Sequence, residues 1–176
     1  MNCKNTFIIW VIGLPNSGKT LLAEGLTKKF NKENITSVLL DGDDIRKVLS
    51  MENKRFLIED RKENARRIGR LASLINGQGI NVIVAANTMF HDIQRYHREH
   101  LKGYFEIYMR TSEKIRRKRD EEKKIYERFD SGELKNVLGL DLEAEEPENP
   151  DVIVNNEEST LMSQEIDRVY REILKK

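Results

Sequence analysis

Residues 13–20 of the chain, which read GLPNSGKT, fit the phosphate-binding pattern G-x-x-x-x-G-K-[ST] in full. The apolar run at residues 7–12 before them predicts a buried parallel strand, and apolar residues at helical spacing after them predict a helix over residues 20–30. Glycines at such a junction let several backbone N–H groups converge on one phosphate at the positive end of the helix. The alternative is a glycine-rich turn that contains a lysine by chance, and the flanking strand and helix argue against it.

We therefore predict an ATP-binding loop with a magnesium ion beside it. Within it, Lys19 reaches the β- and γ-phosphates and the Thr20 hydroxyl binds Mg²⁺. The ATP-binding residues that this interpretation names are Gly13, Leu14, Pro15, Asn16, Ser17, Gly18, Lys19 and Thr20.

A second group of chemically capable residues, DGDDIR at positions 41–46, follows the next apolar run. Phosphoryl transfer to an alcohol needs a carboxylate that accepts the hydroxyl proton, and we assign this catalytic role to Asp43. Asp41 then supports a magnesium-bound water or positions the loop, and Arg46 holds a phosphate of the acceptor. Taken alone, the sequence D-G-D favours a simple turn, and the phosphate-binding loop nearby reverses that preference.

A third group lies at residues 56–69. Arg61 and Asn64 are three residues apart, so on a helix they share a face and point at one ligand. Phe56, just upstream, is able to stack on a base. The alternative is a core aromatic followed by a solvated charged helix.

The elements that must position these residues alternate between strands and helices. We expect strands at residues 7–12, 37–40, 81–86, 104–109 and 151–154, with helices at 20–30, 44–49, 60–76, 93–101 and 164–174. This alternation predicts an α/β fold of the P-loop NTPase type, with a parallel five-stranded sheet and helices on both of its faces. Ligands of such sheets bind at the carboxyl ends of the strands, where the groups above fall.

Residues 113–150, which we call the lid segment, differ from the rest of the chain. They begin basic, end acidic and hold few apolar residues, so we expect one or two helices and a long loop that closes over the phosphates. The alternative is a solvated charged helix with a flexible tail. At 176 residues the chain is most simply one kinase domain, residues 1–176, that includes this lid.

Composition restricts the partners. A net charge of +1 predicts no nucleic-acid track, and no apolar stretch is long enough to span a membrane. The single cysteine, Cys3, agrees with a cytoplasmic protein. We expect His91, His97 and His100 to be surface residues of a helix rather than metal ligands, and Trp10 to lie in the core.

Taken together, the motifs resemble adenylyl-sulfate kinase in order and spacing from about residue 7 to 155. The matching segments are GLPNSGKT at 13–20, LDGDDIR at 40–46, Phe56 with residues 59–61, ENARRIG at 63–69, GELKNVLGLD at 132–141 and EPENP at 146–150. In that family ATP phosphorylates the ribose 3′-hydroxyl of adenosine 5′-phosphosulfate.

The resemblance also implies roles for individual residues. It makes Asp43 the base near the 3′-hydroxyl and assigns Lys19 and Thr20 to ATP and Mg²⁺. Arg46, Arg61 and Asn64 would hold the anion on the 5′ side of the acceptor, Phe56 would stack on its base, and Lys135 would belong to the acceptor-side loop. Because the family is commonly dimeric, the resemblance implies a homodimer.

Three departures from the family pattern fall on the acceptor side. After the third strand the family has I-S-P followed by an aromatic residue, whereas this chain has Asn87-Thr88-Met89-Phe90. The lid motif of the family, R-D-P-K-G-L-Y, corresponds to RDEEKKIY in this chain. The second base-stacking aromatic of the family corresponds to Val137. Loss of one stacking aromatic costs about 1–3 kcal/mol, and the Asn87 amide is able to read a base edge. These changes leave the reaction in place and open the choice of acceptor.

Adenylyl sulfate is therefore one expected acceptor, and another nucleotide such as cytidine 5′-diphosphoramidate, used in capsule modification, is the alternative. A non-catalytic ATP-binding module would not need both Lys19 and Asp43. A sugar or shikimate kinase would not need Phe56, Arg61 and Asn64. A nucleic-acid end kinase would need a basic track that this chain lacks.

Overall fold

The computed structural model describes residues 6–49, 57–121, 123–157 and 160–176. Its centre is a sheet of five parallel strands in the order β2-β3-β1-β4-β5. The strands are β1 (Ile8–Ile12), β2 (Ser37–Asp41), β3 (Asn81–Ala85), β4 (Tyr104–Arg110) and β5 (Val152–Asn155). The predicted five-stranded parallel sheet is confirmed.

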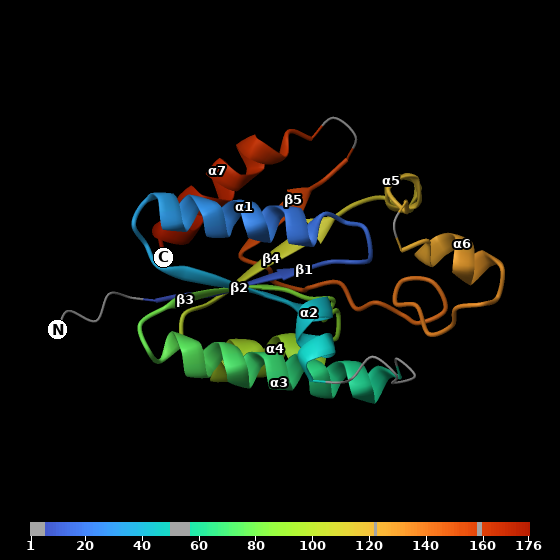
Figure 1. Ribbon diagram of the computed structural model, residues 1–176, viewed down its shortest axis with the longest axis horizontal. Helices are drawn as coiled ribbons and strands as arrows, with labels where there is room; N and C mark the ends of the chain where they lie inside the picture. Colours follow the sequence, from blue (N-terminus) through green and yellow to red (C-terminus); the bar gives the residue numbers. More distant parts are fainter. Residues whose placement is uncertain (1–5, 50–56, 122, 158–159) are drawn as a thin grey trace.

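Helices cover both faces of the sheet (Figure 1). One face carries α1 (Lys19–Lys32) and α7 (Met162–Leu174), and the other carries α3 (Ile58–Asn76) and α4 (His91–His100). Two apolar cores result, one on each side of the sheet. Every residue of β1 and β3 is buried, which explains why these strands read as unbroken apolar runs.

The junction between β2 and the next helix differs from the prediction. The sequence predicted a strand that ends at residue 40 and a helix that begins at about residue 44, whereas the strand continues through Asp41 and α2 (Gly42–Val48) begins at the next residue. The physical reason is a helix cap: Asp41 pairs with Ala85 in the sheet, and its Oδ1 accepts a 2.8 Å hydrogen bond from the backbone N–H of Asp43. Asp43 therefore lies in the first turn of a helix.

The prediction of surface histidines is wrong for His97. Its side chain is fully buried, and its ring centroid lies 4.0 Å from that of Trp10, which is buried as predicted. Burial lowers the pKa of His97 to about 4. The side of α4 that carries His97 packs against α3, where a Cβ at Gly69 would lie 3.0 Å from His97 Nε2, so this position faces the interior.

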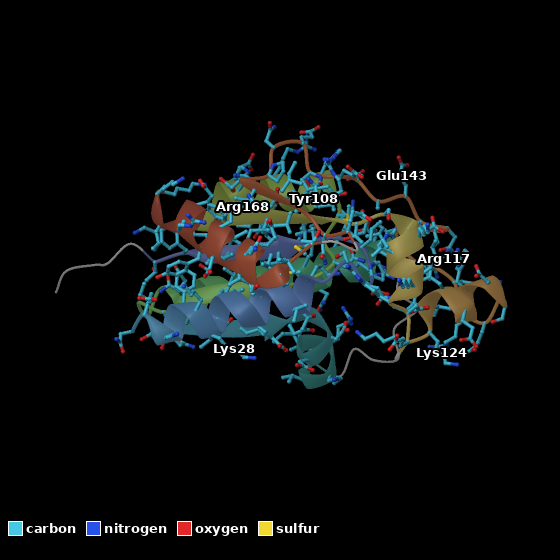
Figure 2. The ribbon with its side chains drawn as sticks, turned by 90° about the horizontal axis from the view of Figure 1, so that it is seen from above. Lys28, Tyr108, Arg117, Lys124, Glu143 and Arg168 are labelled. Carbon is cyan, nitrogen blue, oxygen red and sulfur yellow. The ribbon has the colours of Figure 1, made fainter. Side chains whose placement is uncertain are left out.

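The lid segment holds two short helices, α5 (Glu113–Lys118) and α6 (Ile125–Asp130), which lie beyond the carboxyl ends of the strands (Figure 1). Arg117 joins them, because it pairs with Glu113 at 2.7 Å and with Asp130 at 2.7 Å. Figure 2 shows Arg117 and Lys124 at this end of the molecule, far from Lys28 on α1. None of the described helices is long and apolar enough to cross a membrane.

Candidate active site

The phosphate-binding motif forms a loop between β1 and α1. Asn16 and Gly18 adopt left-handed backbone conformations, with φ of 60° and 93°. Gly18 is the N-cap of α1, and no side chain among the described residues caps that helix. The first N–H groups of α1 are therefore available to an anion, as a phosphate site requires.

Lys19 lies in the first turn of α1 and folds over the loop. Its Nζ donates a 2.8 Å hydrogen bond to the carbonyl oxygen of Leu14. Burial, with the nearby charges of Lys123, Arg116 and Arg46, lowers the pKa of Lys19 to about 7 against the opposing effect of Asp41. A lowered lysine pKa in a cluster of cations indicates a site that attracts a polyanion.

Thr20 and Asp41 meet next to Lys19. The Thr20 hydroxyl donates a 2.9 Å hydrogen bond to Asp41 Oδ2, while Asp41 Oδ1 caps α2. A hydroxyl and a carboxylate at the carboxyl ends of β1 and β2 form the hard-oxygen donor set that Mg²⁺ prefers. The residues present therefore fit a magnesium ion.

Asp43 connects this loop with the lid segment. Its carboxylate forms ion pairs with Arg46, one helical turn along α2, and with Lys123, which comes from the lid segment. Its side chain remains partly exposed. The two ion pairs fix the position of the carboxylate, a group of the kind that accepts a proton from a hydroxyl group.

The predicted acceptor residues gather beside α2. Arg61 Nη2 donates a 2.7 Å hydrogen bond to the carbonyl oxygen of Asn136 in the lid segment. Burial, together with the neighbouring charge of Arg46, lowers the pKa of Arg61 to about 10. The positive charge of Arg46 thus acts on Arg61, and two such cations favour an anion between them.

Two amides and one apolar side chain complete this region. Asn64 is buried on α3, and its Oδ1 atom, like that of Asn87 after β3, has no hydrogen-bond partner in the part of the chain that the structure describes. Val137 is buried, and Asp141 fixes its backbone through a 2.5 Å hydrogen bond. Lys135 is exposed on the same loop. Phe56 lies outside the described residues.

Sequence reasoning missed several residues that hold the phosphate loop. Asn16 Nδ2 donates to Asp120 Oδ1 at 2.8 Å, and the buried Asn156 donates to the carbonyl oxygen of Ser17 at 2.8 Å. Arg116 is buried against Tyr126, to which its Nη1 donates at 2.5 Å. A signal for Asn156 was present, because it lies two residues after the predicted strand 151–154, at the carboxyl end where ligands of such sheets bind.

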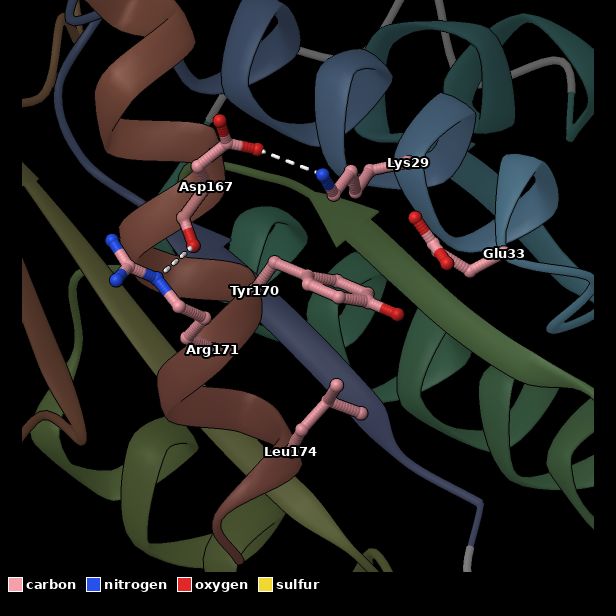
Figure 3. Close-up of a pocket in the computed structure, with 6 residues that line it drawn as sticks. All are labelled: Lys29, Glu33, Asp167, Tyr170, Arg171 and Leu174. Atoms are coloured by element: carbon pink, nitrogen blue, oxygen red, sulfur yellow. Dashed lines mark hydrogen bonds and ion pairs between the residues drawn. The ribbon is translucent and has the colours of Figure 1, made fainter.

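A surface groove between α1 and α7 lies apart from these residues (Figure 3). Lys29 pairs with Asp167 across it at 3.0 Å, and Tyr170 packs edge-on against Phe30 at 5.0 Å. Arg171 donates to the backbone carbonyl oxygen of Asp167 at 3.2 Å. The contacts of Lys29 and Phe30 attach α7 to α1, whereas that of Arg171 lies within α7, so the groove has a structural role.

The parallel sheet, the glycine loop with its lysine and the carboxylate beside it define a phosphate-binding-loop kinase, an ATP-dependent phosphotransferase. A family model described as adenylylsulphate kinase matches residues 5–155, and the chain belongs to that family. An adenylyl-sulfate kinase of Staphylococcus carnosus is 35% identical over 162 residues, which cover 91% of this chain and 80% of the relative. A cytidine diphosphoramidate kinase of Campylobacter jejuni is 31% identical over 169 residues, covering 96% of this chain and 97% of the relative.

The fold agrees with a solved member of the family. The structure of the Mycobacterium tuberculosis APS kinase CysC in complex with AMPPNP and APS superimposes with a TM-score of 0.88 at 27% identity, over 98% of this chain and 99% of that one. Relatives that share the family thus include kinases named for two different acceptors.

Proposed function

We propose that the chain transfers the γ-phosphoryl group of ATP to the ribose 3′-hydroxyl of a nucleoside 5′-phosphate derivative. The observation that carries this proposal is the position of Asp43. The β2–α2 junction brings its carboxylate between Arg46 and Lys123, beside the phosphate loop. A carboxylate beside the phosphate loop is suited to accept the proton of a hydroxyl that attacks the terminal phosphate in line.

The proposed reaction proceeds by direct transfer. Asp43 accepts the proton of the 3′-hydroxyl group while the hydroxyl oxygen forms a bond to the γ-phosphorus. The bond between the γ-phosphorus and the β–γ bridging oxygen breaks, which releases ADP. Lys19 and the N–H groups of α1 hold the phosphates, and Lys123 and Arg116 add positive charge. Mg²⁺, held by Thr20 with support from Asp41, would neutralise phosphate charge when bound.

The acceptor occupies the space between α2, α3 and the lid segment. Arg46 and Arg61 hold the anion on its 5′ side, with Lys135 at the rim, and Asn64 and Asn87 offer two carbonyl oxygens to donor groups of the nucleotide. By the family resemblance, Phe56 would stack on the base.

Two acceptors fit this proposal. Family membership favours adenylyl sulfate, with 3′-phosphoadenylyl sulfate as its product. Cytidine 5′-diphosphoramidate is supported by the similarity to the cytidine diphosphoramidate kinase of Campylobacter jejuni. Val137, which is smaller than the aromatic residue of the family pattern, and the amide of Asn87 support it as well. A pyrimidine needs less stacking surface than a purine, so the loss of one aromatic residue affects it less.

A side-by-side turnover assay with Mg·ATP tests the proposal. Adenylyl sulfate, cytidine 5′-diphosphoramidate, ADP and CDP serve as acceptors, and phosphorus NMR of the products detects a new 3′-phosphate. Preference for adenylyl sulfate assigns the chain to sulfate activation, and preference for the cytidine compound makes Asn87 and Val137 determinants of specificity. Absence of a 3′-phosphate on every nucleotide would contradict the proposed reaction.

We further propose that the protein is a cytoplasmic homodimer, as the family resemblance implies. Light scattering during size-exclusion chromatography gives the mass in solution, which should be twice the chain mass of 20.6 kDa. A mass equal to that of one chain would contradict the dimer.

A further inference from the structure

Asn16 adopts a left-handed conformation that glycine adopts at lower cost. Its φ is 60°, a region that L-residues other than asparagine and aspartate seldom occupy. The backbone of the phosphate loop therefore does not require a side chain at this position. The amide nevertheless makes two contacts, with Asp120 Oδ1 at 2.8 Å and with the carbonyl oxygen of Arg116 at 3.3 Å. Both partners belong to the lid segment.

Asp120 uses the same carboxylate to organise the start of α6. Its Oδ1 also accepts a hydrogen bond from the backbone N–H of Ile125 at 2.9 Å, and its Oδ2 accepts one from that of Tyr126 at 2.6 Å. The position of α6 is thus fixed relative to Asn16. Lys123, which contacts the carboxylate of Asp43, lies between Asp120 and these two N–H groups along the chain.

A second connection runs in parallel. The side chain of Asn156 donates to the carbonyl oxygen of Ser17 at 2.8 Å, and Arg119 donates to the carbonyl oxygen of Asn156 at 3.3 Å. Asn16 of the phosphate loop therefore binds Asp120 of the lid segment directly. The next residue, Ser17, is linked to Arg119 through Asn156. The loop and the lid segment form one hydrogen-bonded unit.

We propose that Asn16 is a positioning residue, which through Asp120 places Lys123 beside Asp43 and so couples the phosphate loop to the lid segment. This inference rests on the proposed function, because it assigns the catalytic carboxylate to Asp43. Asn16 exerts its effect through its side-chain amide, separately from any backbone contact of the loop with phosphate. The coupling aligns the lid cation with the reacting groups when the loop binds ATP.

Asn16→Gly tests the proposal, because it keeps the left-handed backbone and removes only the amide. We expect kcat to fall about tenfold, as for loss of a hydrogen bond to a charged group, with the KM for ATP changed far less. Asn34→Gly is the matched control, since Asn34 has nearly the same φ of 58° in the turn after α1. It should leave both constants unchanged. An unchanged kcat in Asn16→Gly would overturn the proposal.

A Lys123→Met background separates positioning from a general structural effect. If Asn16 acts through Lys123, Asn16→Gly should lower kcat much less in that background than in the wild type. An equal loss in both backgrounds would show that the amide acts by another route and would refute the coupling.

A binding readout keeps this test distinct from that of the proposed function. The readout is the protection against limited proteolysis that bound ATP gives to residues 113–130, and it needs no acceptor. It should weaken in Asn16→Gly and persist in Asn34→Gly. Retained protection in Asn16→Gly would count against the coupling even if the acceptor assay succeeds, and weakened protection would support it even if the acceptor assay fails.

Discussion

Asp43 is the residue at which separate parts of the chain meet. It lies in the first turn of α2, pairs with Arg46 of the same helix, and receives Lys123 from a segment eighty positions further along the chain. Charge complementarity between the carboxylate and Lys123 adds to the hydrogen bonds and packing that join the lid segment to the phosphate loop. The chemical role of Asp43 follows from this position.

Asp43→Asn should lower kcat by about 10²–10⁴, because the amide keeps the shape of the side chain and loses the ability to accept a proton. ATP binding should change little, since Lys19 and the loop are intact. Asp44→Asn is the matched control, because Asp44 is exposed and forms an ion pair with Lys47 at 2.9 Å. Steady-state kinetics and nucleotide titration measure both effects. Wild-type turnover in Asp43→Asn would remove the residue from the mechanism.

ATP binding should be coupled to proton uptake at Lys19. The pKa of Lys19, lowered to about 7 in the free protein, must rise when a polyphosphate binds beside the amine. At pH 8 the free side chain is mostly neutral and the bound one is protonated, so uptake should approach about one proton per ATP. Calorimetry in buffers of different ionisation enthalpy measures this number. Lys19→Met should abolish the uptake, whereas Lys28→Met, on the exposed side of the same helix, should retain it.

At the scale of elements, the strands explain why much of the site could be predicted. The loop after β1, the junction after β2 and Asn87 after β3 all follow apolar runs, and parallel strands carry their C-terminal residues to one edge. The sequence could not show that Asp41 caps α2, because a cap and a turn use the same residues. It also could not place Lys123 or Asp120, because the charged lid segment carries no apolar periodicity from which contacts can be inferred.

The loop at residues 136–142 is also an element of the phosphate site. Gly139 has a φ of 84°, and a Cβ at this position would lie 2.7 Å from the Leu14 side chain. Leu14 provides the carbonyl oxygen that receives Lys19. The two segments therefore pack directly against each other through Gly139 and the Leu14 side chain.

Gly139→Ala should destabilise the protein by about 1–3 kcal/mol more than Gly79→Ala, because overpacking adds to the backbone strain. Gly79 shares the φ of 84° and has open space around its Cβ position, so it isolates the contact with Leu14. The KM for ATP should also rise in Gly139→Ala alone. Urea unfolding and steady-state kinetics provide the measurements. Equal effects of the two substitutions would contradict close packing between loop and lid segment.

At the scale of the whole molecule, stability depends on two cores that share one sheet. His97 lies fully buried in the core formed with α3 and α4, with its ring against Trp10. Its folded-state pKa of about 4 lies below the ordinary value of 6.5 because burial disfavours the charged form. The unfolded chain therefore binds a proton more readily, and stability is complete above pH 6.5 and falls as the pH falls toward 4.

This histidine should contribute about 2 kcal/mol to the loss of unfolding free energy between pH 7.5 and pH 5. Urea unfolding at the two pH values measures the loss. His97→Gln should reduce the difference between the two values, whatever its effect on absolute stability. His100→Gln, at an exposed position of the same helix, should leave the difference as in the wild type. An undiminished difference in His97→Gln would show that the buried ring does not control acid stability.

Trp10 is the single tryptophan of the chain, and its indole N–H donates a 2.9 Å hydrogen bond to the hydroxyl of Thr88. Thr88 directly follows Asn87, on the loop that borders the acceptor region. The chain therefore carries one indole fluorophore, which is shielded from water in the middle of β1 and bonded to the acceptor loop. Its emission spectrum reports on that loop without an attached dye, and a displaced Thr88 alters the signal through the indole nitrogen.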